Sequence, residues 1–149
     1  MTEKKLINAG KAFIDTNVFI YIQRTDEPSK TKISEEAIDF FDCITSTQVF
    51  NEICNILTRK YPIPIEKVKR VLHSIEEKCT ILTVTNDYPV KALDYHSKYS
   101  ISYYDALMVV AALEGNCKYL ISEDMQDGLI IDKKLQIVNI YKRTDLLLG

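Results

Sequence analysis

Acidic residues interrupt two apolar segments of this chain, where an ionised side chain needs compensation. Asp15 stands inside the run KAFIDTNVFIYI, which reads as a strand buried on both faces followed by further apolar residues. Glu52 falls at the i+3 position from Val49, on the apolar stripe of a helical pattern. An unpaired charge in such a setting is costly, so each acid needs a helix end, a proton or a positive partner.

Other acids occur near the ends of later apolar segments. Asp105 lies in the first turn of the almost wholly apolar helix YYDALMVVAALEG, where Ser102 and Asp105 also match a capping pattern. Asp124 follows an apolar strand in YLISEDMQDG, beside the hydroxyl of Ser122. Asp127 is a weaker candidate, because QDG also reads as a turn.

The chemistry of these acids follows from their mutual repulsion. At a separation of roughly 4 Å, a like-charged pair costs about 4 kcal/mol at an effective dielectric constant near 20. The motifs themselves supply no lysine or arginine, so a divalent cation is the simplest compensation. Carboxylate oxygens favour Mg²⁺ or Mn²⁺ over zinc, and magnesium held in this way usually meets a substrate phosphate. The acids therefore indicate metal-assisted phosphoryl transfer to water.

The surrounding pattern predicts elements that bring these acids together. Strand-like runs cover residues 11–15, 43–47, 79–85, 118–122 and 135–141. Helical patterns follow Asp15 directly and then cover residues 34–42, 48–60, 65–78, 88–99 and 103–114. Strands separated by helices predict an α/β fold with a mainly parallel sheet, whose ligands bind beyond the carboxyl ends of the strands. The polar residues 24–32 are expected to form the most mobile loop.

Composition sets limits on partners and location. With 149 residues the chain is about one domain, and its formal charge of −2 gives no overall attraction to RNA or anionic lipid. The segment MTEKKLINAGK lacks the apolar stretch of a signal peptide, and no run is long enough to span a membrane. The four cysteines are scattered and form no CxxC motif. We therefore expect a cytoplasmic, reduced protein without a zinc site.

Any contact with RNA would depend on local groups. The candidate basic rim consists of Arg24, Lys30, Lys32, Arg59, Lys60, Lys67 and Arg70, although each of these also reads as an ordinary solvated residue. Tyr103 and Tyr104 adjoin Asp105 and are candidates for stacking on a base, with core packing as the alternative for at least one of them.

Four segments together resemble the PIN-domain nucleases, in particular the VapC-type toxins of bacterial and archaeal toxin–antitoxin systems. These segments are FIDTN, STQVFNE, YYDALMVVAAL and LISED. The resemblance covers roughly residues 11–141. It implies one PIN-like domain over residues 1–149, built as a three-layer α/β/α sandwich around a mainly parallel sheet.

The resemblance also implies roles for particular residues. The catalytic, metal-binding acids would be Asp15, Glu52, Asp105 and Asp124, with Mg²⁺ or Mn²⁺ as the cofactor. The supporting polar groups would be Thr16, Asn17, Ser46 and Ser122, and Asp127 is left open as a fifth acid. The implied reaction is hydrolysis of RNA by a metal-activated water. The implied partners are a second copy of the chain and a small antitoxin that covers the active site.

Alternative functions remain open at this point. A stand-alone RNA-processing nuclease would differ from a toxin only in its partner. A non-catalytic PIN-like binding module would keep the fold without turnover. The haloacid-dehalogenase phosphatases also place an aspartate after the first strand, but they need a second acid two residues later, where this chain has Asn17.

Overall fold

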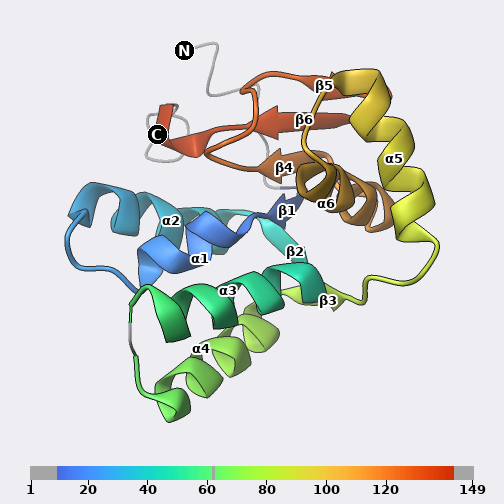
Figure 1. The fold of residues 1–149 in the computed structure, drawn as a ribbon. Helices are drawn as coiled ribbons and strands as arrows, with labels where there is room; N and C mark the ends of the chain where they lie inside the picture. The colour runs from blue at the N-terminus through green and yellow to red at the C-terminus, as the bar shows by residue number, and fades with distance from the viewer. Residues whose placement is uncertain (1–9, 62, 143–149) are drawn as a thin grey trace.

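The computed structural model describes residues 10–61 and 63–142. Figure 1 shows the arrangement of their six strands and six α-helices. The strands are β1 (Lys11–Ile14), β2 (Asp42–Ser46), β3 (Thr80–Leu82), β4 (Tyr119–Ile121), β5 (Ile130–Ile131) and β6 (Leu135–Val138). The helices are α1 (Thr16–Ile22), α2 (Pro28–Phe40), α3 (Thr47–Arg59), α4 (Ile65–Lys78), α5 (Tyr88–Tyr99) and α6 (Tyr103–Glu114). Residues 1–9, on which the signal-peptide expectation largely rests, lie outside the described part.

The strands form one sheet in the order β3-β2-β1-β4-β6-β5. All neighbouring strands are parallel except β5 and β6, which pair antiparallel. This confirms the predicted α/β fold with a mainly parallel sheet. β1 and β4 are direct neighbours, although more than 100 residues separate them in the sequence. Their carboxyl ends, and the residues that follow, are therefore side by side.

The helices cover both faces of this sheet. The connections from β1 to β2 and from β2 to β3 step along the sheet in one direction, and the connection from β3 to β4 steps back. Right-handed crossovers consequently place α1 to α4 on one face and α5 and α6 on the other. Figure 1 shows α5 and α6 grouped apart from α1 to α4. The result is the expected three-layer α/β/α sandwich.

The apolar patterns of the helices explain their positions. Residues 106–112 of α6 are all buried, and α6 contacts β1, β2 and β4. On α3 the stripe of Val49, Ile53 and Leu57 is buried, and Glu52 is half-buried at its edge. The longest of the six described α-helices, α4, has 14 residues. None of the helices in the described ranges has the length and apolar character needed to cross a bilayer.

Two local features differ from the sequence expectations. Helix α2 begins at Pro28, so part of the segment expected to be a mobile loop is helical. Proline suits the first turn of a helix, and the Thr31 hydroxyl ties this turn to the end of α1 by donating to the Tyr21 carbonyl oxygen over 2.8 Å. The β5 strand was not predicted, since its hairpin turns at Asp132 and Lys133, both with positive φ, without the usual glycine.

Candidate active site

The acids predicted to act together come from four elements at one edge of the sheet. Asp15 follows β1, and its backbone N–H donates to the carbonyl of Ile121 at the end of β4 over 3.0 Å. Asp124 lies in the loop just after that strand. Glu52 lies in the second turn of α3, which begins where β2 ends, and Asp105 lies in the first turn of α6.

Asp15 has the most constrained environment of the four acids. Only 6% of its surface is exposed. Its Oδ1 accepts from the backbone N–H of Thr16 over 2.6 Å, which caps α1, and its Oδ2 accepts from the Ser122 hydroxyl over 2.8 Å. Its pKa is raised to about 7, mainly by burial; the two hydrogen bonds oppose this shift, and the negative charges of Glu52 and Asp105 add to it.

Both carboxylate oxygens of Glu52 accept hydrogen bonds. The Thr16 hydroxyl donates to Oε1 over 2.6 Å, so Thr16 contacts Asp15 through its backbone and Glu52 through its side chain. The Gln48 amide donates to Oε2 over 3.1 Å, and also to the Tyr104 carbonyl at the same distance. Gln48 thus links α3 to the start of α6. Sequence reasoning missed Gln48, although its place one turn before Glu52 was a signal.

Asp105 and Asp124 complete the group. The backbone N–H of Asp105 donates to the Ser102 hydroxyl over 3.1 Å, so the predicted capping pattern is present. Burial raises the pKa of Asp105; a side-chain interaction between the Ser102 hydroxyl and the Asp105 carboxylate opposes this, and the charges of Asp124 and Glu52 add to it. Asp124 is exposed, and its Oδ2 accepts from the Asn17 amide over 3.0 Å. The four acids are therefore electrostatically coupled, and we refer to them as the acid cluster.

The donor set of the acid cluster suits a hard divalent cation, because every group in it is an oxygen. The Asp15 carboxylate is buried among negative charges. The Ser46 hydroxyl, at the junction of β2 and α3, is also buried and has no hydrogen-bond partner within the described part of the chain. Across the residues that the structure describes, no three His, Cys, Asp or Glu side chains stand close enough together to hold a metal ion. Three of the carboxylates instead accept hydrogen bonds from polar side chains: Glu52 from Thr16, Asp124 from Asn17 and Asp15 from Ser122.

The neighbouring acids have separate partners. Asp127 accepts from the backbone N–H of Asn139 over 2.9 Å, and its role as a fifth acid stays a prediction. Glu123 accepts from the Tyr21 hydroxyl and the Lys30 ammonium, both over 2.6 Å. Burial tends to raise the pKa of Glu123, but these two hydrogen bonds outweigh it and the pKa is lowered. Glu123 was not selected from the sequence.

Some of the basic and aromatic residues expected to contact RNA already bind other side chains of the chain, and others are exposed. Arg24 donates to both carboxylate oxygens of Asp26, and Lys30 pairs with Glu123. Tyr103 packs against the core, whereas Tyr104 is 65% exposed. A depression of about 450 Å³ lies beside Glu52 and is lined by Thr47, Gln48, Asn51, Glu52, Val84 and Tyr104.

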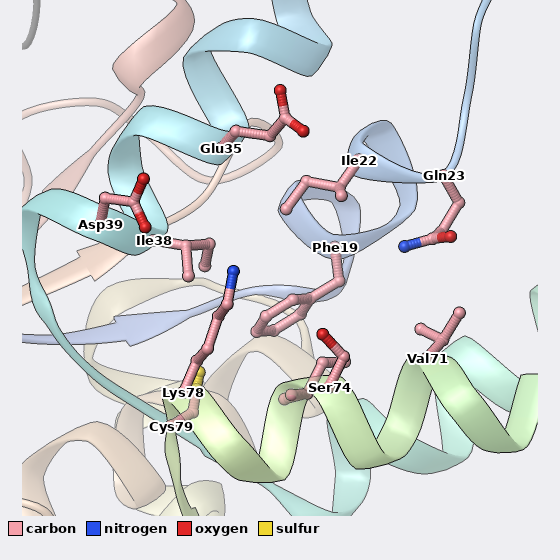
Figure 2. A pocket seen from close by; sticks show the side chains of 11 residues that line it. Phe19, Ile22, Gln23, Glu35, Ile38, Asp39, Val71, Ser74, Lys78 and Cys79 are labelled. Atoms are coloured by element: carbon pink, nitrogen blue, oxygen red, sulfur yellow. The ribbon is translucent and has the colours of Figure 1, made fainter.

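A second concave region lies away from the acid cluster, between α1, α2 and α4. This cavity of about 310 Å³ contains no member of the acid cluster. Figure 2 shows the Phe19 ring projecting from α1 into it and the Lys78 side chain extending from α4 toward α2. The lining combines apolar side chains from all three helices with the charged side chains of Glu35, Asp39 and Lys78.

Comparison with known proteins places this arrangement in a family. The PIN domain model matches residues 12–143. The chain belongs to the PIN domain family. No curated protein shows significant sequence similarity to it.

Several solved structures share the PIN fold of this chain. A toxin–antitoxin complex from Klebsiella pneumoniae has a TM-score of 0.63 at 17% identity, covering 86% of this chain and 96% of that one. VapC20 of Mycobacterium tuberculosis, described as a sarcin–ricin loop cleaving toxin, has a TM-score of 0.62 at 14% identity, covering 76% and 91%. VapBC2 of Rickettsia felis, bound to a DNA fragment from its promoter, has a TM-score of 0.60 at 15% identity, covering 87% and 99%.

Proposed function

We propose that this PIN domain protein is an endoribonuclease that uses Mg²⁺ or Mn²⁺ and is the toxin of a toxin–antitoxin pair. The observation that carries the proposal is the acid cluster itself. Four carboxylates from distant segments act on one another at the carboxyl edge of the sheet, and the charges that act on buried Asp15 are both negative. A positive partner from outside the chain would relieve this repulsion.

The residues that would hold the cation are Asp15, Glu52, Asp105 and Asp124. When bound, a divalent cation supplies an activated water and neutralises charge on the phosphate. The chain itself orients the carboxylates: Thr16 holds Glu52, Asn17 holds Asp124, and Ser122 holds Asp15. Because its pKa is about 7, Asp15 is partly protonated near neutral pH and must release this proton to bind a cation. The exposed Tyr104 ring offers a stacking surface beside Glu52.

The structural relatives support the choice of substrate and partner. One is described as a toxin that cleaves the sarcin–ricin loop, and another is a toxin–antitoxin complex. By analogy we assign an RNA substrate and a small antitoxin to this chain. A homodimer, a cytoplasmic location and the extent of the domain over residues 1–149 stay predictions.

The decisive experiment is incubation of the purified protein with total RNA in Mg²⁺, in Mn²⁺ and in chelator, followed by mapping of the cut ends. We expect cleavage only with a divalent cation, and none from Asp15→Asn, which keeps the side-chain shape and removes the charge. Asp132→Asn is the matched control. Asp132 also accepts a side-chain hydrogen bond, but its partner is Tyr95 of α5, and Asp132 is not part of the acid cluster. Undiminished cleavage by Asp15→Asn would remove Asp15 from the mechanism.

The same assay separates the alternatives. Binding of Mn²⁺ without cleavage of any RNA would favour the non-catalytic binding module. Cleavage that the product of a neighbouring short reading frame does not inhibit would favour a stand-alone processing enzyme. Inhibition by that product, with formation of a stable complex, is the result expected of a toxin.

A further inference from the structure

Glu123 differs from its neighbour Asp124 in having a positive partner. Its carboxylate accepts from the Tyr21 hydroxyl of α1 through Oε1 and from the Lys30 ammonium of α2 through Oε2, both over 2.6 Å. The Glu123 side chain is 21% exposed. One side chain from the loop after β4 therefore contacts two separate helices.

The cationic partner of Glu123 is itself confined. The Lys30 nitrogen lies 5.0 Å from the ring centroid of Tyr21 and 5.7 Å from that of Tyr141. These two rings meet edge to face, with centroids 5.2 Å apart, and the Tyr141 hydroxyl is hydrogen-bonded to Ser34 over 2.7 Å. Contact with two rings restricts the Lys30 side chain, so its pairing with Glu123 should cost less conformational freedom than the pairing of a typical surface lysine.

The loop that carries Asp124 is anchored on both sides of this residue. Before it, the Ser122 hydroxyl donates to Asp15 and accepts from the backbone N–H of Met125 over 3.3 Å. The Glu123 carbonyl accepts from the side-chain amide of Asn139 over 3.2 Å. After it, Met125 is buried. Asp124 is exposed, so its location depends on these neighbours together with Asn17.

We propose that Glu123 is a positioning residue, which fixes the loop bearing Asp124 against α1 and α2 and thereby sets the affinity of the acid cluster for its divalent cation. This inference rests on the proposed function of the acid cluster. Residues that orient the ligands of a metal typically change metal affinity by about 10- to 100-fold when they are replaced. Lys30 acts in the same way through Glu123, and in this role it does not bind the RNA backbone.

Calorimetric titration of the RNA-free protein with Mn²⁺ tests this role directly. We expect Glu123→Gln and Lys30→Met each to weaken Mn²⁺ binding about tenfold. The matched control is Glu27→Gln, which removes another carboxylate near Lys30, at 3.7 Å, outside the Asp124 loop. This control should bind Mn²⁺ as the wild type does.

A double-mutant cycle separates positioning from a general effect on folding. In an Asp124→Asn background, Glu123→Gln should cause no further loss of Mn²⁺ affinity, because its effect passes through Asp124. A lower melting temperature with unchanged Mn²⁺ affinity would mean that Glu123 is structural only. A raised KM for RNA in Lys30→Met, with unchanged Mn²⁺ affinity, would mean that Lys30 contacts the substrate instead.

The outcome for the wild type keeps the two proposals distinct. Wild-type protein that binds Mn²⁺ and cleaves RNA, together with a Glu123→Gln variant of equal Mn²⁺ affinity, would overturn the positioning role alone. Wild-type protein that neither binds Mn²⁺ nor cleaves RNA would overturn the proposed function, and this inference with it.

Discussion

Asp15 and Asp132 are aspartates that directly follow strands, β1 and β5, and their surroundings shift their pKa values in opposite directions. Burial and negative neighbours raise the pKa of Asp15 to about 7. The pKa of Asp132 is lowered, mainly by the Tyr95 hydroxyl, which donates to it over 2.6 Å, and also by Lys98 at 3.7 Å. Both aspartates accept hydrogen bonds, but Asp132 also has a positive neighbour, whereas Glu52 and Asp105 place negative charge near Asp15.

Under the proposed function, this difference separates an acid that stabilises the fold from one that would bind a cation. Asp132 ties the β5–β6 turn to α5, since its backbone N–H also donates to the Tyr99 hydroxyl over 3.0 Å. Its charge therefore stabilises the folded chain directly. The acid cluster brings negative charges together, and no lysine or arginine of residues 10–61 and 63–142 forms an ion pair with it; this is unfavourable unless a cation joins them.

The largest expected effect contrasts Asp105 with Asp132. Asp105→Asn should reduce RNA cleavage by more than about 100-fold, since loss of a direct ligand should exceed the usual effect of an orienting residue. The backbone N–H of Asp105, which donates to Ser102, is retained, so the start of α6 should be unchanged. Initial rates at saturating Mn²⁺ measure this effect. Equal losses of activity in Asp105→Asn and Asp132→Asn would contradict the claim that the acid cluster acts in cleavage whereas Asp132 only stabilises the fold.

A second prediction uses the pH dependence of stability in chelator. The folded pKa of Asp15, about 7, exceeds its ordinary value of 3.8, so the folded state binds more protons between these values. The free energy of unfolding therefore falls as the pH rises through this window, by at most about 4 kcal/mol. Asp15→Asn cannot ionise at this position and does not lose stability in this way. Its free energy of unfolding should therefore exceed that of the wild type only slightly near pH 4 and most at pH 8.

Urea unfolding of both proteins across this pH range measures the difference. Mn²⁺ added at pH 8 should stabilise the wild type and not Asp15→Asn, because a ligand that binds only the folded state raises the free energy of unfolding. A stability difference that does not vary with pH would show that Asp15 ionises normally in the folded protein.

A smaller effect is expected from the groups that orient the acid cluster. Asn17→Ala removes the amide that donates to Asp124 and should weaken Mn²⁺ binding about tenfold. Stability should change little, because alanine is favourable within α1. Asn55→Ala, at an exposed position of α3, is the matched control. An unchanged Mn²⁺ affinity in Asn17→Ala would show that Asp124 does not need this hydrogen bond.

The smallest expected effect concerns Asp132. Asp132→Asn should lower the free energy of unfolding by about 1–2 kcal/mol at pH 7 through weakened hydrogen bonds, without changing Mn²⁺ affinity. Because the folded pKa of Asp132 is lowered, the contribution of its charge is present above the ordinary value and is lost as the pH falls through the folded value. Chemical unfolding at pH 7 and near pH 3 should show the difference shrinking at the acidic value.

Local patterns were enough to predict most of the elements and the candidate acids. Asp15 and Asp124 stood out because they follow apolar strands, and Glu52 because it falls on an apolar stripe. The start of α2 and the β5–β6 hairpin were missed, because a polar segment with proline and a turn without glycine resemble loops. Contacts with residues of other elements stabilise both segments: Thr31 is hydrogen-bonded to the end of α1, and Asp132 to Tyr95 of α5.

The amino-acid sequence by itself determined the alternation of strands and helices, the apolar core and the places where acids meet element ends, because these depend on neighbours a few residues apart. Only the tertiary structure decided which groups meet across the chain. The pairs Asn17–Asp124, Thr16–Glu52 and Lys30–Glu123 have no local signature, because each joins segments far apart in sequence. Strand order and helix packing brought these segments together, and the resulting burial and charge determined the direction in which each carboxylate pKa shifts.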